Sequence, residues 1–101
     1  MDSADRARKK AWKAAERDRA RAAFPLPDER LAEFFQWLKA ALADHGCDKT
    51  RRLAELWAAK NSVPIGPLAA WLDGNSGFCD CEVVANTGQH WREMRSAPID
   101  A

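Results

Sequence analysis

Between residues 28 and 46, apolar side chains recur at the spacing of one helix face, and this pattern limits the fold more than any other. The residues that follow the i, i+3, i+4, i+7 spacing are Leu31, Phe34, Phe35, Leu38, Ala41 and Leu42. Pro27 and Asp28 are typical of a helix start, and Gly46 is typical of a left-handed helix end. We therefore expect a helix here, with one face buried in a core.

Three further helices are expected from composition and end signals. Residues 3–23 are rich in Ala, Lys, Arg and Glu, which are good helix formers. A helix over 49–60 has Asp48 as its expected N-cap, because a short acceptor side chain satisfies the first amides of a helix. A short helix from Pro67 to about residue 73 follows a connector rich in proline and glycine.

A short C-terminal strand is expected over residues 78–85, where two different faces alternate. A lone strand leaves its edges unpaired, so it needs a partner. Residues 62–65, or the same strand of a second copy, could form a two-stranded sheet with it. The predicted fold class is therefore mostly α, in the α+β sense, with about four helices and one strand.

Charge divides the chain of 101 residues into three parts. Residues 1–25 carry eight basic and four acidic side chains, whereas the remainder carries eight basic and eleven acidic ones. We predict a basic helical arm over 1–25, a compact domain over 26–88 and a tail over 89–101. No apolar run has the length of a signal peptide or a membrane span, so a cytoplasmic protein with reduced thiols and no membrane contact is expected.

Three cysteines and one histidine are the side chains with the clearest chemistry. His45 and Cys47 stand at an expected helix end, and Cys79 and Cys81 lie one residue apart in the expected strand. Thiolate and imidazole are the donors of tetrahedral zinc sites. On a strand, Cys79 and Cys81 would point to one face, so the turn at Cys47 needs only to meet that face. These four residues are the predicted ligands of a structural zinc ion that ties the turn to the strand.

Two other interpretations of the cysteines stay open at this stage. A C-x-C pair can form a strained disulfide, with Cys47 as the resolving thiol of a redox protein. Alternatively, the cysteines are small buried hydrophobic side chains, Asp48 is only a helix cap, and Asp80 and Glu82 only face solvent. An aspartate between two cysteines is an unusual choice if packing alone matters.

The basic arm is a second candidate site. Basic side chains between residues 6 and 21 can neutralise phosphates, and Trp12 can stack on a base. The four acidic side chains of the arm weaken its field, and a solvated helix is the alternative. The chain has no Gly-rich phosphate loop and no H-E-x-x-H motif, so no enzyme class is indicated. The sequence favours a binding or regulatory module whose partner is a protein or a nucleic acid.

Two motifs make the chain resemble a known bacterial family. They are Gly46-Cys47-Asp48-Lys49-Thr50 and Ser76-Gly77-Phe78-Cys79-Asp80-Cys81-Glu82-Val83, with Trp71-Leu72 between them and Ala85-Asn86 after them. With these motifs, residues 24–87 resemble the family catalogued as domain of unknown function 2695. Lys49 stands where that family often has histidine, and Phe78 replaces a tyrosine. The family has no assigned activity, so the resemblance implies a fold and a candidate site, and no function.

Overall fold

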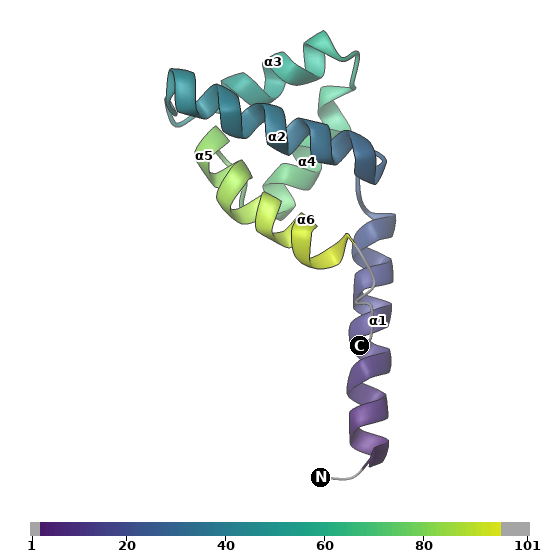
Figure 1. Ribbon diagram of the computed structural model, residues 1–101. Helices are drawn as coiled ribbons and strands as arrows, with labels where there is room; N and C mark the ends of the chain where they lie inside the picture. Colours follow the sequence, from purple (N-terminus) through teal and green to yellow (C-terminus); the bar gives the residue numbers. More distant parts are fainter. Residues whose placement is uncertain (1–2, 96–101) are drawn as a thin grey trace.

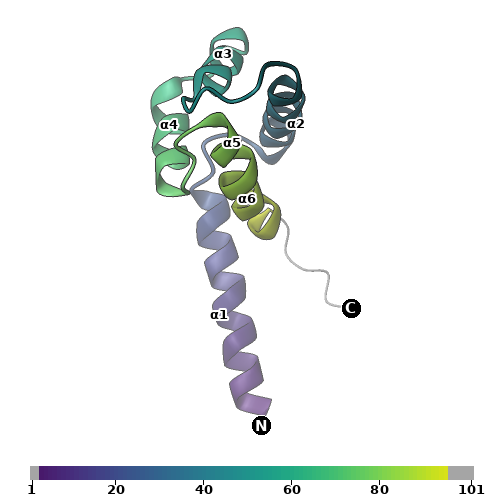
Figure 2. The ribbon, with the colours of Figure 1, turned by 90° about the vertical axis from the view of Figure 1, so that its left-hand side faces the viewer.

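The computed structural model describes residues 3–95, and this part of the chain contains helices and loops but no strand. The helix α1 projects away from a body formed by the other helices (Figure 1, Figure 2). None of the helices over these residues is long and apolar enough to cross a bilayer. The elements in chain order are α1 (Ser3–Ala22), α2 (Asp28–His45), α3 (Arg52–Lys60), α4 (Ile65–Gly74), α5 (Asp80–Glu82), the π-helical turn η1 (Val83–Thr87) and α6 (Gly88–Met94).

The first two helices confirm the sequence prediction closely. α2 begins at Asp28 and ends before Gly46, which has a φ of 71° and donates its N–H to the Leu42 carbonyl at 2.8 Å. Glycine adopts a positive φ without steric cost, but the ψ of 173° is extended, so Gly46 ends the helix without forming the predicted left-handed cap. Because both ends and the buried stripe of α2 are encoded locally, the helix can be read from sequence alone.

The predicted strand over residues 78–85 is wrong, and with it the two-stranded sheet, the α+β fold class and pairing between copies through this strand. The backbone is extended only as far as Cys79, and helical structure begins at Asp80. This segment buries side chains at helical spacings of three and four residues, namely Asp80, Val83, Thr87 and Trp91. The alternation of residue types over 78–85 therefore does not mark a strand with one buried face. Two of the four buried side chains, Asp80 and Thr87, are polar, so the hydrophobic pattern did not reveal the helical spacing.

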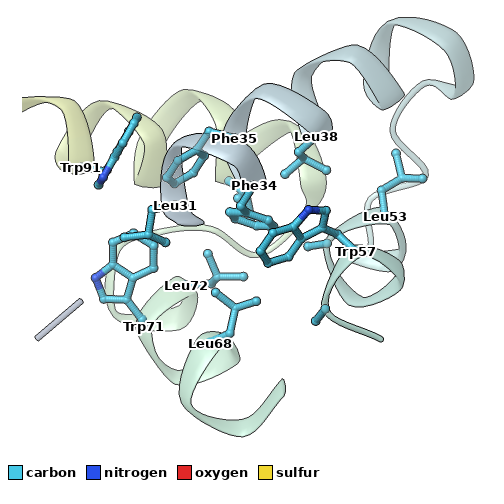
Figure 3. Packing of buried hydrophobic residues seen from close by; sticks show 13 residues of the cluster. Leu31, Phe34, Phe35, Leu38, Leu53, Trp57, Leu68, Trp71, Leu72 and Trp91 are labelled. Carbon is cyan, nitrogen blue, oxygen red and sulfur yellow. The ribbon is translucent and has the colours of Figure 1, made fainter. Parts of the chain in front are cut away.

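An aromatic core holds the body together between α2, α3, α4 and α6 (Figure 3). The ring of Phe34, which is fully buried, lies 5.0 Å from that of Trp57 and 5.1 Å from that of Phe35, measured between centroids. Such tilted aromatic pairs contribute about 0.5–1.5 kcal/mol beyond their area burial. The buried hydrophobic residues are Leu31, Phe34, Phe35, Leu38, Leu53, Ala54, Trp57, Ala58, Leu68, Trp71, Leu72, Val83 and Trp91.

The helix α6 packs onto the start of α2. The ring of Trp91 lies 5.0 Å from that of Phe35, and its indole N–H donates to the Asp28 carboxylate at 3.0 Å. Arg95 forms an ion pair with the same carboxylate at 2.7 Å and lies over the Trp91 ring. Residues 89–95 of the predicted tail are thus attached to the body, while residues 96–101 lie outside the described range.

Candidate thiol site

The loop between α2 and α3 is folded by Asp48. Its carboxylate accepts the hydroxyl of Thr50 at 2.5 Å and the Thr50 N–H at 3.0 Å, and these two bonds lower the pKa of Asp48. The Thr50 hydroxyl oxygen in turn accepts the N–H of Arg52 at 3.2 Å. The prediction that Asp48 is the N-cap of α3 is therefore wrong. The helix α3 begins at Arg52 instead of residue 49. An aspartate that bonds the amide two residues later builds a turn of its own.

The cap of α3 comes from a distant part of the chain. Asp80 is buried, and its two carboxylate oxygens accept the N–H groups of Leu53 and Ala54, each at 3.0 Å. Its own N–H donates to the Thr50 carbonyl at 2.9 Å. A carboxylate in this position satisfies amides that have no partner within the helix, and it interacts favourably with the helix dipole. This contact gives a physical reason for an aspartate between two cysteines.

Arg51 and Gly77 make a second tie between the same two segments. The Arg51 guanidinium donates to the Gly77 carbonyl at 3.2 Å and forms an ion pair with Asp73 at 2.6 Å. Gly77 is buried, and a Cβ at this position would lie 2.5 Å from the Thr87 hydroxyl oxygen. Only glycine allows the chain to pass this close to η1 on its way to Cys79.

The three cysteines meet at this junction, although they come from segments more than 30 residues apart. The Cys47 sulfur accepts the N–H of Lys49 at 3.3 Å. The N–H of Cys81 and the thiols of Cys79 and Cys81 lie close enough to the Cys47 sulfur to lower its pKa. All three cysteines are free; Cys47 and Cys79 are half-buried, and Cys81 is exposed. We call this set of three side chains the thiol cluster.

The thiols of the cluster differ in acidity. The pKa of Cys47 is lowered, first by the N–H of Cys81 and then by the N–H of Lys49. For Cys79, a bond from the Glu82 N–H lowers the pKa, but burial and the neighbouring Cys47 thiol outweigh it and raise the pKa. The pKa of Cys81 is raised, chiefly by its thiol bond to Cys47. These directions make Cys47 the most acidic of the three thiols.

His45 does not join the thiol cluster. It is exposed at the C-terminal end of α2, and over residues 3–95 no hydrogen bond connects its side chain to a cysteine. Within the same range, no group of three or more His, Cys, Asp or Glu side chains is arranged to hold a metal ion. Three of the four predicted ligands are thus neighbours without metal-binding geometry, and no contact described over residues 3–95 links the fourth to them.

The structure defines a small helical domain with a surface cluster of thiols fixed by an interhelical aspartate. The chain belongs to the family described as "Protein of unknown function (DUF2695)", whose model matches residues 34–86 and so spans the whole thiol cluster. This confirms the resemblance drawn from the two motifs.

Its relatives include the uncharacterised proteins Rv2271 and MT2332 of Mycobacterium tuberculosis and Mb2294 of Mycobacterium bovis. Each is 33% identical over 86 residues, which cover 81% of this chain and 87% of the relative. No solved structure matches.

Proposed function

We propose that this protein is a small binding module in which Cys47, Cys79 and Cys81 bind a zinc ion that fixes the α2–α3 loop to the start of α5. The observation that carries this proposal is the meeting of three thiols from two distant segments at one point of the surface. Thiolates are preferred zinc donors, and a metal held by both segments would resist their separation.

Packing alone does not account for the thiol cluster. Cysteine that serves as a small hydrophobic side chain is among the most deeply buried residue types. Here Cys81 is exposed and the other two thiols are only half-buried, while the hydrophobic core lies elsewhere. A surface position gives the thiols access to an ion from solvent, which a buried position would deny.

The hydrogen bonds of Asp80 and Arg51 prepare the site for a metal. They place the two thiol-bearing segments against each other independently of the thiols themselves. Binding would then exchange the hydrogen bonds among the thiols for metal–sulfur bonds and release their protons.

Elemental analysis of protein purified under reducing conditions tests the proposal. We expect about one zinc ion per chain, and a melting temperature that falls when a chelator removes it. The Cys79→Ser variant should lose most of the zinc. The control variant Ala85→Ser introduces the same side chain at an exposed position of η1 and should retain the zinc. If the purified protein contains no metal and the chelator does not change its melting temperature, the proposal is refuted.

A thiol redox function is a second candidate, favoured by a lowered pKa at Cys47 beside two thiols whose pKa is raised. Two thiols would lose two electrons and two protons to a peroxide, forming one disulfide while the peroxide is reduced to water. One equivalent of hydrogen peroxide should then reduce the free thiols from three to one, reversibly with dithiothreitol. If all three thiols remain free after the hydrogen peroxide treatment, this function is excluded.

Nucleic-acid binding through α1 is a third candidate, favoured by a one-sided row of basic residues. At spacings of three and four, this row consists of Arg6, Lys10, Lys13, Arg17 and Arg21. On another side of the helix, Trp12 is 59% exposed. Affinity for mixed-sequence duplex DNA should fall steeply with salt and weaken in K10E/K13E more than in R8E/R19E. A salt slope near zero would reject this function.

A further inference from the structure

Three disulfide pairings are conceivable among the thiols of the cluster, and the backbone between Cys79 and Cys81 disfavours one of them. A bridge between these two cysteines would close a small ring across Asp80. The Asp80 N–H donates to the Thr50 carbonyl at 2.9 Å, and its carboxylate accepts two N–H groups of α3, each at 3.0 Å. Closing the ring requires the backbone here to rotate, because a disulfide fixes the positions of both Cβ atoms. That rotation would break the contacts that hold α5 against α3.

Cys47 is the thiol that lies next to both of the others. Its sulfur accepts the N–H of Lys49 at 3.3 Å, which fixes its position in the α2–α3 loop. The thiols of Cys79 and Cys81 both lie close enough to this sulfur to lower its pKa. A bridge that leaves Asp80 in place must therefore include Cys47.

The two candidate partners of Cys47 differ in their surroundings. Cys79 is half-buried at the N-cap position of α5, and its sulfur lies beside the N–H of Glu82 in that helical turn. Cys81 is exposed, and its own N–H lies beside the Cys47 sulfur. A reagent from solvent therefore reaches Cys81 more easily than Cys79, and the backbone that carries Cys81 is already next to Cys47.

We infer that oxidation by a hydroperoxide joins Cys47 to Cys81 and leaves Cys79 as a free thiol. The inference rests on the redox function proposed above as the second candidate. One of the two thiols attacks the peroxide, the O–O bond breaks, and a sulfenic acid forms together with an alcohol or water. The second thiol attacks the sulfenic sulfur, an S–S bond replaces the S–O bond, and water leaves with the proton of that thiol. Two electrons pass from the two sulfurs to the peroxide.

This bridge would reinforce a contact that the reduced protein already makes. It would join the α2–α3 loop to α5 beside the hydrogen bonds of Asp80, and it would close a loop of more than 30 residues. A disulfide across a loop of this length stabilises a protein when the folded geometry accepts it, because it restricts the unfolded chain. The oxidised protein should therefore melt at least about 10 °C higher than the reduced protein.

Peptide mapping tests the pairing, because cleavage before aspartate places each cysteine in a peptide of its own. The three peptides are 44–47, 73–79 and 80–99. Metal-free, full-length protein is treated with one equivalent of hydrogen peroxide, alkylated with iodoacetamide and digested without reduction. Mass spectrometry should show the peptides of Cys47 and Cys81 linked, and that of Cys79 alkylated. Dithiothreitol should separate the linked peptides.

Two serine variants provide a matched comparison. Cys79→Ser should form the same bridge as the wild type, at the same rate and with the same rise in melting temperature. Cys47→Ser carries the same substitution in the other segment of the cluster. It should form no bridge within the chain, and peroxide should leave its melting temperature unchanged.

The outcomes separate this inference from the redox function itself. If all three thiols stay free after the peroxide treatment, both are overturned. If two thiols are lost but the linked peptides include that of Cys79, only the pairing of Cys47 with Cys81 is overturned. A bridge between two chains, seen as a dimer on a non-reducing gel, would also overturn the pairing alone. An oxidised protein that melts no higher than the reduced one would overturn the reinforcement of the contact between the α2–α3 loop and α5.

Discussion

The two ends of the segment from Gly77 to Met94 are attached to the body in contrasting ways. At the α6 end, the main attachment is the ring of Trp91, which packs against Phe35 in the aromatic core, with polar contacts to Asp28 at its edge. At the α5 end, the attachment is polar, and the buried carboxylate of Asp80 bonds two amides of α3. The first attachment removes a large apolar area from water, whereas the second fixes the position of a few atoms.

This contrast separates stability from precision. Apolar packing is non-directional, so it stabilises α6 without specifying the position of a neighbouring loop to a fraction of an ångström. Hydrogen bonds at 3.0 Å are directional and tolerate little displacement. The thiol cluster lies beside the polar attachment, where directional contacts place its three sulfurs. Substitutions at the two ends should therefore affect different properties.

Trp91→Ala should have the largest effect on folding. It removes a ring that is 5% exposed, together with the hydrogen bond to Asp28. We expect a loss of about 3–5 kcal/mol in the free energy of unfolding, measured by urea denaturation. Trp12→Ala, at a tryptophan that is mostly exposed, is the control and should change stability little. Equal losses in the two variants would contradict the described core.

Asp80→Asn should cost less stability but disturb the thiols more. An amide can still accept one bond, but the second α3 amide would face a donor, so we expect a loss of about 1–3 kcal/mol. Cys81 should become more reactive toward iodoacetamide, because its contact with Cys47 loosens. Glu55→Gln, on the exposed face of α3, is the control. If alkylation of Cys81 stays unchanged, Asp80 does not position the cluster.

The acidity of Cys47 gives a third measurement, on metal-free reduced protein. Its pKa is lowered and that of Cys81 is raised, so at pH 7 alkylation should modify Cys47 first. Mass spectrometry of peptides after partial labelling gives the order. The difference in alkylation rate between Cys47 and Cys81 should vanish in urea, and it should become smaller in Asp80→Asn. Labelling of Cys81 before Cys47 in the folded protein would contradict the described hydrogen bonds.

The smallest effect is expected at Asp48, in the loop itself. Its bonds to Thr50 lower its pKa in the folded state, so its contribution is complete above the ordinary carboxyl pKa of about 4. As pH falls through the lower folded-state pKa, that contribution is lost. The stability difference between wild type and Asp48→Asn should thus shrink from pH 5 to pH 2. A difference constant over this range would place Asp48 outside the turn.

The sequence was sufficient for α2 because its signals are local. Its buried stripe and its end at Gly46 all lie within one stretch, so no distant contact is needed to read them. The C-terminal segment could not be read in this way. It buries Asp80 and Thr87, which hydropathy patterns treat as solvent-facing, and each is satisfied by a partner elsewhere in the chain.

The candidate site was only partly accessible to sequence reasoning. The sequence singled out Cys47, Cys79 and Cys81 because cysteine side chains can bind a metal or form a disulfide. The predicted reason for their proximity, a strand with Cys79 and Cys81 on one face, is wrong. They meet because Asp80 lies between two of them and reaches 26 residues back to α3. Such a contact leaves no periodic pattern. The odd aspartate in the C-x-C motif was the available signal.

The remote cap of α3 has a consequence for how the protein matures on the ribosome. Synthesis delivers α3 well before the residue that satisfies its first amides, which therefore stay hydrated while the nascent chain grows through α4. The contact between Asp80 and α3 therefore cannot form until residue 80 has been synthesised. A chain interrupted before this point contains Cys47 without the other two cysteines, and the first amides of its α3 lack the carboxylate of Asp80.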